Sequence, residues 1–326
     1  MLLSVRTSGS KQKNPQISNS STYHGVFVYF FLLLLVLCVF AHFVAEVSVA
    51  RFVEEVLGSS VAFSSIPNKE TDAPILPAKI RAIRCQKAEN TWCGSPCGIM
   101  DQYVSSAAQS GAFLLIDCTS LDYQETKMNL QSKTDSKVDE DEVVLVVTNS
   151  NVQHDIAGGE YPIRVQQCKE ATRVLNDKTP TITTLREATL YDVETAFDKT
   201  SVCYRRAKHV VTENARTLEC KLALEAGDWK TVGRLMNESH ASMKDDYEVS
   251  CDEIDCLVRI AQTTEGVYGS RLTGGGFGGC TVTLVKKSAA SNLVQRLQRD
   301  YRTEHHKECV CFETQPSQGA HMVSLD

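Results

Sequence analysis

Residues 269–280 read GSRLTGGGFGGC, and glycine fills every position from 274 to 279 except Phe277. A glycine run gives up backbone entropy, so it is expected where the chain needs positive φ angles or a close approach of its backbone to another group. Apolar residues on either side predict two short strands, at 269–272 and 281–286. The run lacks the Gly-Lys-Ser/Thr of a P-loop, and no helix follows it directly as in a Rossmann fingerprint. A loop beside a phosphate and a tight connection between strands both remain open.

Composition narrows the class of protein. The chain has 326 residues, a length that predicts about two domains. Its hydrophobic share of 42% and charged share of 23% exclude wholesale disorder. A net charge of -6 and a pI near 5.8 argue against a general nucleic-acid binder, which needs a broad cationic face. The protein is therefore predicted to be a globular enzyme or binding domain.

The 13 cysteines are an odd number scattered along the chain. A disulfide framework needs pairing and is typical of short secreted chains, so we interpret them as free thiols of a reducing compartment. Neither Cys93/Cys97 nor Cys309/Cys311 has the spacing of a zinc site, and no second Cys or His pair completes either one. The sequence therefore predicts no metal-binding residues of the chain's own.

The pattern of apolar residues predicts α+β layering around mixed sheets. The expected helices are 46–57, 78–90, 98–110, 203–226, 229–243, 252–264 and 288–304. Besides the two strands around the glycine run, strands are expected at 112–117, 143–148 and 309–313.

The first part of the chain is unlike the rest. Residues 1–25 are rich in Ser, Asn and Lys and are predicted to be disordered. Residues 26–45 are almost wholly apolar, which predicts a transmembrane or signal-anchor segment. An open alternative is that residues 1–43 are not native to the remainder, as at a misread exon boundary. After this segment we expect an N-terminal domain over 46–190 and a C-terminal domain over 191–326.

A candidate acid–base residue lies in the stretch PCGIMDQY, residues 96–103. Asp101 falls in the first turn of an expected helix, where a carboxylate could accept a proton from a substrate hydroxyl. The alternative is an aspartate favoured there by the helix dipole. Two polar stretches, TNSNVQH at 148–154 and GGEYP at 158–162, follow an expected strand and either line a site or form a solvated turn.

Taken together, these stretches resemble the galactokinases, members of the GHMP sugar and metabolite kinases. The stretches occur in the family's order and at its spacing: PCGIMDQY, LLIDCTSL, TNSNVQH, EYPIRVQQC, HASMKDDYEVSCDEID and GSRLTGGGFGGCTVTL. The likeness runs from about Val44 to Val323. The N-acetylgalactosamine kinases are the nearest alternative, but their glycine loop typically reads Gly-Ala-Gly-Trp-Gly-Gly, whereas this loop carries Phe277.

The resemblance implies roles for particular residues. Asp101 matches the base, or electrostatic orienter, for the anomeric hydroxyl of the sugar. Gly98 matches the glycine whose backbone approaches the sugar, and Tyr161 matches the tyrosine beside it. The third GHMP motif, which lies by the substrates and supports the phosphate loop, corresponds to Gly274, Gly275, Gly276, Gly278 and Gly279.

The family's activity is ATP-dependent phosphorylation of galactose to galactose 1-phosphate with Mg²⁺. The resemblance thus implies galactose and ATP as ligands and a cytoplasmic monomer with no nucleic-acid partner, or a membrane location if the 26–45 segment is genuine.

This sequence departs from the family pattern near its beginning. It has no counterpart of the early Gly-Arg-Val-Asn-x-Ile-Gly-Glu-His-x-Asp-Tyr motif or of the phosphate-binding Pro-x-Gly-x-Gly-Leu-Ser-Ser-Ser-Ala motif. We therefore expect a two-domain GHMP-kinase fold that lacks the first strands of its N-terminal domain. A galactokinase, a non-catalytic sugar- or ATP-binding regulator and a membrane-anchored fragment without a ligand are the functions left open.

Overall fold

A computed structural model describes residues 76–92, 97–128, 142–152 and 160–320. The expected disordered segment 1–25, the apolar segment 26–45 and the helix at 46–57 lie outside the described residues. Among the helices that the structure describes, none is both long and apolar enough to cross a membrane.

Most of the expected elements are present. The helices are α3 (Ala78–Trp92), α4 (Met100–Ala107), α5 (Glu160–Lys178), α6 (Leu190–Ala196), α7 (Val202–Ala226), α8 (Trp229–Ser242), α9 (Asp252–Gln262) and α10 (Lys287–His305). Two short helical turns, η1 (Leu185–Glu187) and η2 (Met243–Tyr247), join them. The strands are β1 (Ala112–Asp117), β2 (Asp122–Lys127), β3 (Val143–Asn149), β4 (Val267–Thr273), β5 (Cys280–Lys286) and β6 (Val310–Thr314). Of these, β2, α5 and α6 are additional elements that the apolar pattern did not predict.

The main sheet is antiparallel and has the strand order β4-β5-β3-β6. Strands β4 and β5 form a hairpin whose connection is the glycine run, with Thr273 opposite Cys280. Asn149, the last residue of β3, also lies opposite Cys280. The loops that follow β3 and β4 therefore emerge at one end of the sheet.

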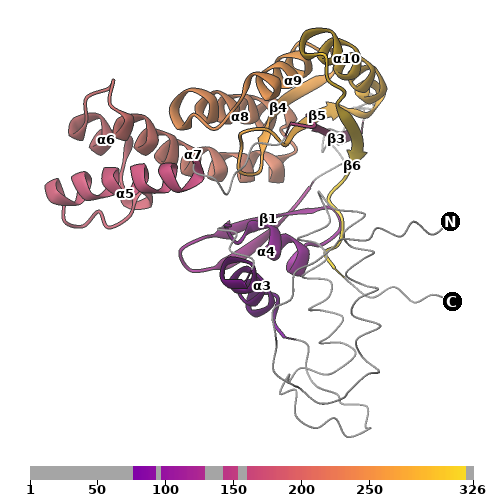
Figure 1. Ribbon diagram of the computed structural model, residues 1–326. Helices are drawn as coiled ribbons and strands as arrows, with labels where there is room; N and C mark the ends of the chain where they lie inside the picture. The colour runs from indigo at the N-terminus through magenta and orange to yellow at the C-terminus, as the bar shows by residue number, and fades with distance from the viewer. Residues whose placement is uncertain (1–75, 93–96, 129–141, 153–159, 321–326) are drawn as a thin grey trace, which may run out of the picture.

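Helices cover both faces of this sheet. Neighbouring residues of a strand point to opposite faces, so each strand contributes side chains to both. On one face, Val144 and Val146 pack against α9 and α10, where Leu257 and Leu297 are fully buried. On the other face, Val143 belongs to a cluster with residues of α7 and α8. Figure 1 shows α9 and α10 above the sheet and α5 and α6 projecting to one side.

Side-chain and glycine caps explain where the long helices begin and end. The Ser201 hydroxyl accepts the amide of Tyr204 at the start of α7, and Gly227 ends that helix with a φ of 72°. Asp228 then accepts the amide of Thr231 and opens α8. Because each cap satisfies amides or carbonyls that a helix end leaves unpaired, the expected break at 227–228 is confirmed.

A smaller unit carries the start of the described chain (Figure 1). Helices α3 and α4 pack on the antiparallel hairpin β1–β2 through Ala82, Tyr103 and Ile116. The segment after β6 returns to this unit, where the Gly319 amide donates to the carbonyl of Ala108, just after α4, and the Ala320 amide donates to that of Ser105 in α4. The C-terminal segment therefore ties the main sheet to the smaller unit.

Two expectations are wrong in detail. The helix expected at 98–110 begins only at Met100 and ends at Ala107, because the next residue, Ala108, is extended with a ψ of 142°. The loop expected through Glu160–Pro162 is the first turn of α5. A proline is compatible with that turn, since its missing amide would have no partner within the helix.

The contact between α8 and β4 depends on two glycines. A Cβ atom at Gly233 would lie 2.1 Å from the carbonyl oxygen of Tyr268, and one at Gly269 would lie 2.2 Å from the carbonyl oxygen of Gly233. The helix therefore rests directly on the backbone of the strand.

We predict that Gly233→Ala destabilises the fold by about 1–3 kcal/mol, because the methyl group must push α8 away from β4. The direction of the change is informative, because Gly→Ala inside a helix otherwise raises the free energy of unfolding by up to about 1 kcal/mol. Urea denaturation measures the change, and Lys230→Ala on the exposed face of α8 is the matched control. A Gly233→Ala protein as stable as the parent would contradict the close contact.

Candidate functional site

The glycine run between β4 and β5 is a succession of left-handed turns. Its positive φ angles are 83° at Gly274, 89° at Gly276, 58° at Phe277, 124° at Gly278 and 76° at Gly279. Since residues with a Cβ rarely adopt these angles, the predicted need for positive φ is confirmed at these glycines.

Two backbone segments flank this loop, and we call them its walls: residues 150–152 after β3 and residues 247–249 before α9. The Phe277 amide donates to the carbonyl of Val249 at 2.7 Å, and a Cβ at Gly276 would lie 2.2 Å from that same oxygen. The Gly279 amide donates to the carbonyl of Val152 at 3.0 Å, and a Cβ at Gly278 would lie 2.5 Å from that oxygen. The loop thus needs glycine for close approach as well as for its angles.

The segment after β3 forms one of these two walls. Both the amide and the hydroxyl of Ser150 donate to the carbonyl of Gly279, at 2.9 and 2.8 Å. The hydroxyl of Tyr301 in turn donates to the carbonyl of Ser150 at 2.9 Å. Ser150 is fully buried and Asn151 is exposed, so the described part of this polar stretch supports the glycine loop and is not simply a solvated turn.

Arg164 in the first turns of α5 joins the other wall to the loop. Its Nε donates to the carbonyl of Tyr247 at 2.8 Å, and its Nη2 donates to that of Glu248 at 2.7 Å. The guanidinium also lies over the ring of Phe277, 5.6 Å from its centre, within cation–π range. Sequence reasoning missed this residue, although it lies inside the EYPIRVQQC stretch.

A second arginine fixes the same wall from within. Arg206 is 1% exposed, and its guanidinium donates to the Gln167 side chain at 2.7 Å, to the Asp246 carbonyl at 2.7 Å and to the Glu248 carboxylate at 2.6 Å. This contact lowers the pKa of Glu248, whose backbone is left-handed with a φ of 56°. A fully partnered buried charge of this kind fixes the position of the backbone around it.

The residues expected to contact a sugar lie at the start of α4. Ile99 precedes this helix without any side-chain cap, and Asp101 is exposed in its first turn. No described residue donates to the Asp101 carboxylate, and desolvation raises its pKa, whereas a capping aspartate would have its pKa lowered. A Cβ at Gly98 would have no atom within 4 Å, so the backbone there is open to a ligand.

Asp101 and the glycine loop belong to different parts of the fold. Among the described residues, no hydrogen bond joins the start of α4 to the loop between β4 and β5. Tyr161 lies in the first turn of α5, close in sequence to Arg164, and its side chain is outside the described part. The structure thus brings together the glycine loop, the segment after β3 and the start of α5.

Comparisons with known proteins point to one family. Residues 221–303 match the family described as GHMP kinases C terminal. The chain is 48% identical over 247 residues to the galactokinase of Homo sapiens, an alignment that covers 75% of this chain and 58% of that protein. It is 40% identical over 243 residues to the galactokinase of Roseiflexus sp. (strain RS-1), covering 74% and 59%. A crystal structure of Lactococcus lactis galactokinase complexed with galactose has a TM-score of 0.71 at 25% identity, covering 87% of this chain and 77% of that one.

The chain is similar to the GHMP kinases. Its similarity is to the galactokinases in particular, and it spans somewhat under three fifths of the length of these two curated relatives. The expected α+β GHMP-kinase fold is confirmed. The expected lack of its first strands concerns residues outside the described part and stays a prediction.

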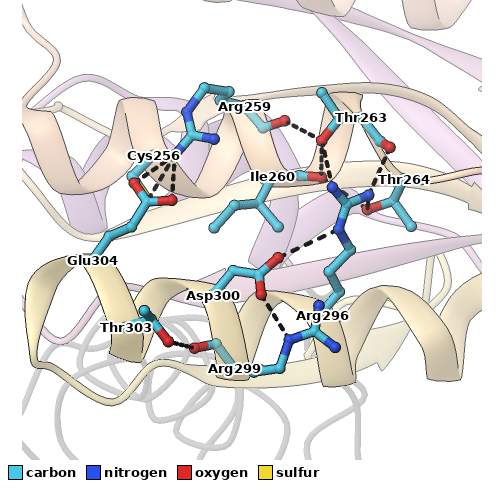
Figure 2. Close-up of polar contacts among 10 residues, drawn as sticks. All are labelled: Cys256, Arg259, Ile260, Thr263, Thr264, Arg296, Arg299, Asp300, Thr303 and Glu304. Atoms are coloured by element: carbon cyan, nitrogen blue, oxygen red, sulfur yellow. Dashed lines mark hydrogen bonds and ion pairs between the residues drawn. The ribbon is translucent and has the colours of Figure 1, made fainter.

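One cluster of described residues has residue types suited to a metal. Ligand atoms of Cys256, Glu304 and His305 lie within 4.8 Å of one another, between α9 and α10. However, Nη2 of Arg259 donates to both carboxylate oxygens of Glu304, at 2.7 and 2.6 Å (Figure 2). Burial and the neighbouring Glu304 raise the pKa of Cys256 to about 11, so its thiol stays protonated at neutral pH. The cluster therefore joins the two helices through the ion pair between Arg259 and Glu304.

A buried histidine supports the wall that ends in Glu248. The imidazole of His209 stacks on the ring of Tyr247 with centres 4.4 Å apart, and its Nδ1 lies 3.0 Å from the Ser242 hydroxyl. Burial lowers the pKa of His209 to about 4. The neutral imidazole is therefore the form that fits this wall.

We predict that this histidine makes the fold acid-sensitive between about pH 6.5 and 4. In this range the unfolded chain takes up a proton that folded His209 does not, so stability falls with pH by up to about 3 kcal/mol. Above pH 6.5 both states are neutral and the effect vanishes. Urea denaturation at pH 7 and pH 4.5 measures it.

The variant His209→Phe keeps the ring stack and removes the titrating group, so it is expected to lose less stability between these two pH values than the parent. His306→Asn, at an exposed position, is the control and should keep the parent's pH dependence. If His209→Phe lost as much stability between pH 7 and pH 4.5 as the parent does, His209 would not be the group that makes the fold acid-sensitive.

Proposed function

We propose that this chain is a sugar 1-kinase of the galactokinase type, which transfers the γ-phosphoryl group of ATP to the anomeric hydroxyl of galactose. The support is its similarity to proteins named galactokinase and to a solved galactokinase complexed with galactose. Since the chain spans only part of those curated relatives, the activity is inferred from the residues that it retains.

The observation that carries the proposal is the state of Asp101. Its carboxylate accepts no hydrogen bond from a described residue, and partial desolvation raises its pKa. A capping carboxylate would accept amides of that helix, and a carboxylate stabilised only by the helix dipole would have a lowered pKa. The open backbone at Gly98 lies within one helical turn and leaves room for a sugar hydroxyl beside it. These features suit a group that accepts or orients the proton of the attacking hydroxyl.

The second part of the proposed site is the glycine loop. Phosphoryl transfer depends mainly on positioning and on neutralisation of charge, so a rigid loop beside the phosphates has a direct use. Gly274, Gly275 and Gly279 are exposed, which leaves their backbone open to a ligand. Mg²⁺ would be held chiefly by the nucleotide phosphates, with a carboxylate such as Asp101 within the range of partners that it prefers. When bound, it would neutralise phosphate charge.

We also propose a cytoplasmic location for the kinase region and a domain boundary near residues 190–191. Every cysteine of the described residues is a free thiol, as expected for a reducing compartment. ATP, the proposed phosphoryl donor, is found in that compartment.

The decisive residue is tested by Asp101→Asn, which keeps shape and removes the negative charge. Residues 1–43 would be replaced by the corresponding N-terminal segment of Homo sapiens galactokinase, so that both early family motifs are present. We predict galactose-dependent ADP release by this chimera and a fall of at least ~10²-fold in kcat for Asp101→Asn. A coupled assay for ADP measures both proteins, with N-acetylgalactosamine as the alternative substrate.

Glu125→Gln, an exposed carboxylate of β2, is the matched control and should leave kcat unchanged. If Asp101→Asn turned over like the parent while its melting temperature fell, Asp101 would be a structural residue and the proposal would be wrong. A chimera that binds galactose and ATP without turnover would favour the non-catalytic regulator.

A further inference from the structure

A cavity of about 230 Å³ lies between the hairpin β1–β2 and the helices α7 and α8. Much of its lining is apolar and includes Phe113, Leu224 and Met236. Asp101 and the glycine loop do not line it, so it is separate from the proposed sugar site. Two polar groups line this cavity: a half-buried guanidinium without an ion-pair partner and a buried hydroxyl without a hydrogen-bond partner among the described residues.

The first of these groups is Arg271, on β4. Its Nε donates to the carbonyl of Leu272 at 3.0 Å, and no carboxylate of the described residues forms an ion pair with its guanidinium. Burial lowers its pKa, but a guanidinium remains charged at neutral pH. Arg271 is half-buried, and a cation that is partly shielded from water without a counterion is unfavourable, so an anion in the cavity would offset that cost.

The nearest carboxylate at the wall is already occupied. Glu213 pairs with Arg216 and also accepts the hydroxyl of Ser239 at 2.6 Å. Lys221, another lining residue, pairs with Glu225 at 2.9 Å. The positive charge of Arg271 is thus the one that this part of the described chain leaves unbalanced.

The second group is the hydroxyl of Thr126 on β2. This residue is 2% exposed and lines the cavity, and its Oγ1 has no hydrogen-bond partner among the described residues. A buried hydroxyl without a partner is uncommon in folded proteins. It can donate to an acceptor placed in the cavity.

We propose that this cavity binds a small carboxylate with an apolar body. The planar fork of a guanidinium matches a carboxylate through two parallel hydrogen bonds, and the Thr126 hydroxyl supplies a further donor. The volume lies below the ~300–1,000 Å³ of pockets for drug-sized ligands, so the ligand is about the size of benzoate. The apolar lining takes the ring or a short hydrocarbon chain. The site is independent of the proposed kinase activity.

Benzoate is the probe, and benzamide is its neutral counterpart of the same shape. Calorimetric or ligand-observed NMR titration of the full chain should show benzoate binding at least about tenfold more tightly than benzamide, since hydrogen bonds to a charged group are the stronger ones. Arg271→Met should lose this preference, and Thr126→Val should weaken benzoate binding. Arg186→Met removes an exposed arginine away from the cavity and should bind like the parent.

A second readout locates the ligand without any substitution. Cys220 lines the cavity and Cys118 is exposed outside it. Benzoate should slow the alkylation of Cys220 by iodoacetamide and leave that of Cys118 unchanged. Equal binding of benzoate and benzamide, unaltered binding by Arg271→Met, absence of protection at Cys220, or tighter binding of inorganic phosphate than of benzoate would each overturn the proposal.

Discussion

The hydrogen bonds from the glycine loop to the carbonyls of Val249 and Val152 are the constraint on which the arrangement of this site depends. They join β4 and β5 to the segment after β3 and to the segment before α9, which are far apart in the sequence. Backbone can approach backbone this closely only where side chains are absent, and the positions without room for a Cβ are Gly276 and Gly278. The composition of the loop therefore follows from what it touches as much as from its own φ angles.

Buried charge then makes this arrangement specific. Arg164 and Arg206 both donate to carbonyls of the segment before α9, so that segment cannot move without leaving a guanidinium unpartnered. By contrast, Asp101 and Arg271 have charges for which the described chain supplies no ion pair. The first group of charges organises the protein, and the second lies at the two proposed ligand sites. The physical distinction between structural and functional charges here is whether the fold itself satisfies them.

Much of the fold could be predicted from the sequence, because local signals agreed with the tertiary structure. The strand at 112–117 and the break at 227–228 follow from apolar runs and from a Gly-Asp pair. Strand β2 was not predicted, since DYQETK is polar and mostly exposed. Helix α5 was missed because Gly and Pro around Glu160 favour a loop. The roles of Arg164 and Arg206 arise only when distant segments pack, which no local pattern reveals. The place of Asp101 in the first turn of an expected helix made it a candidate, and the family resemblance gave Asp101 and Gly98 their expected roles.

Close backbone contact, provided by particular glycines, holds this loop in place. Hydrogen–deuterium exchange at the amides of Phe277 and Gly279 tests it directly, in the full chain and in Gly276→Ala, with Gly275→Ala at an exposed position as the control. We expect both amides to be protected in the parent and in the control. Gly276→Ala should expose at least the Phe277 amide to fast exchange, because its methyl group would displace the Val249 carbonyl. Fast exchange of both amides in the parent, or full protection in Gly276→Ala, would contradict this role of the glycines.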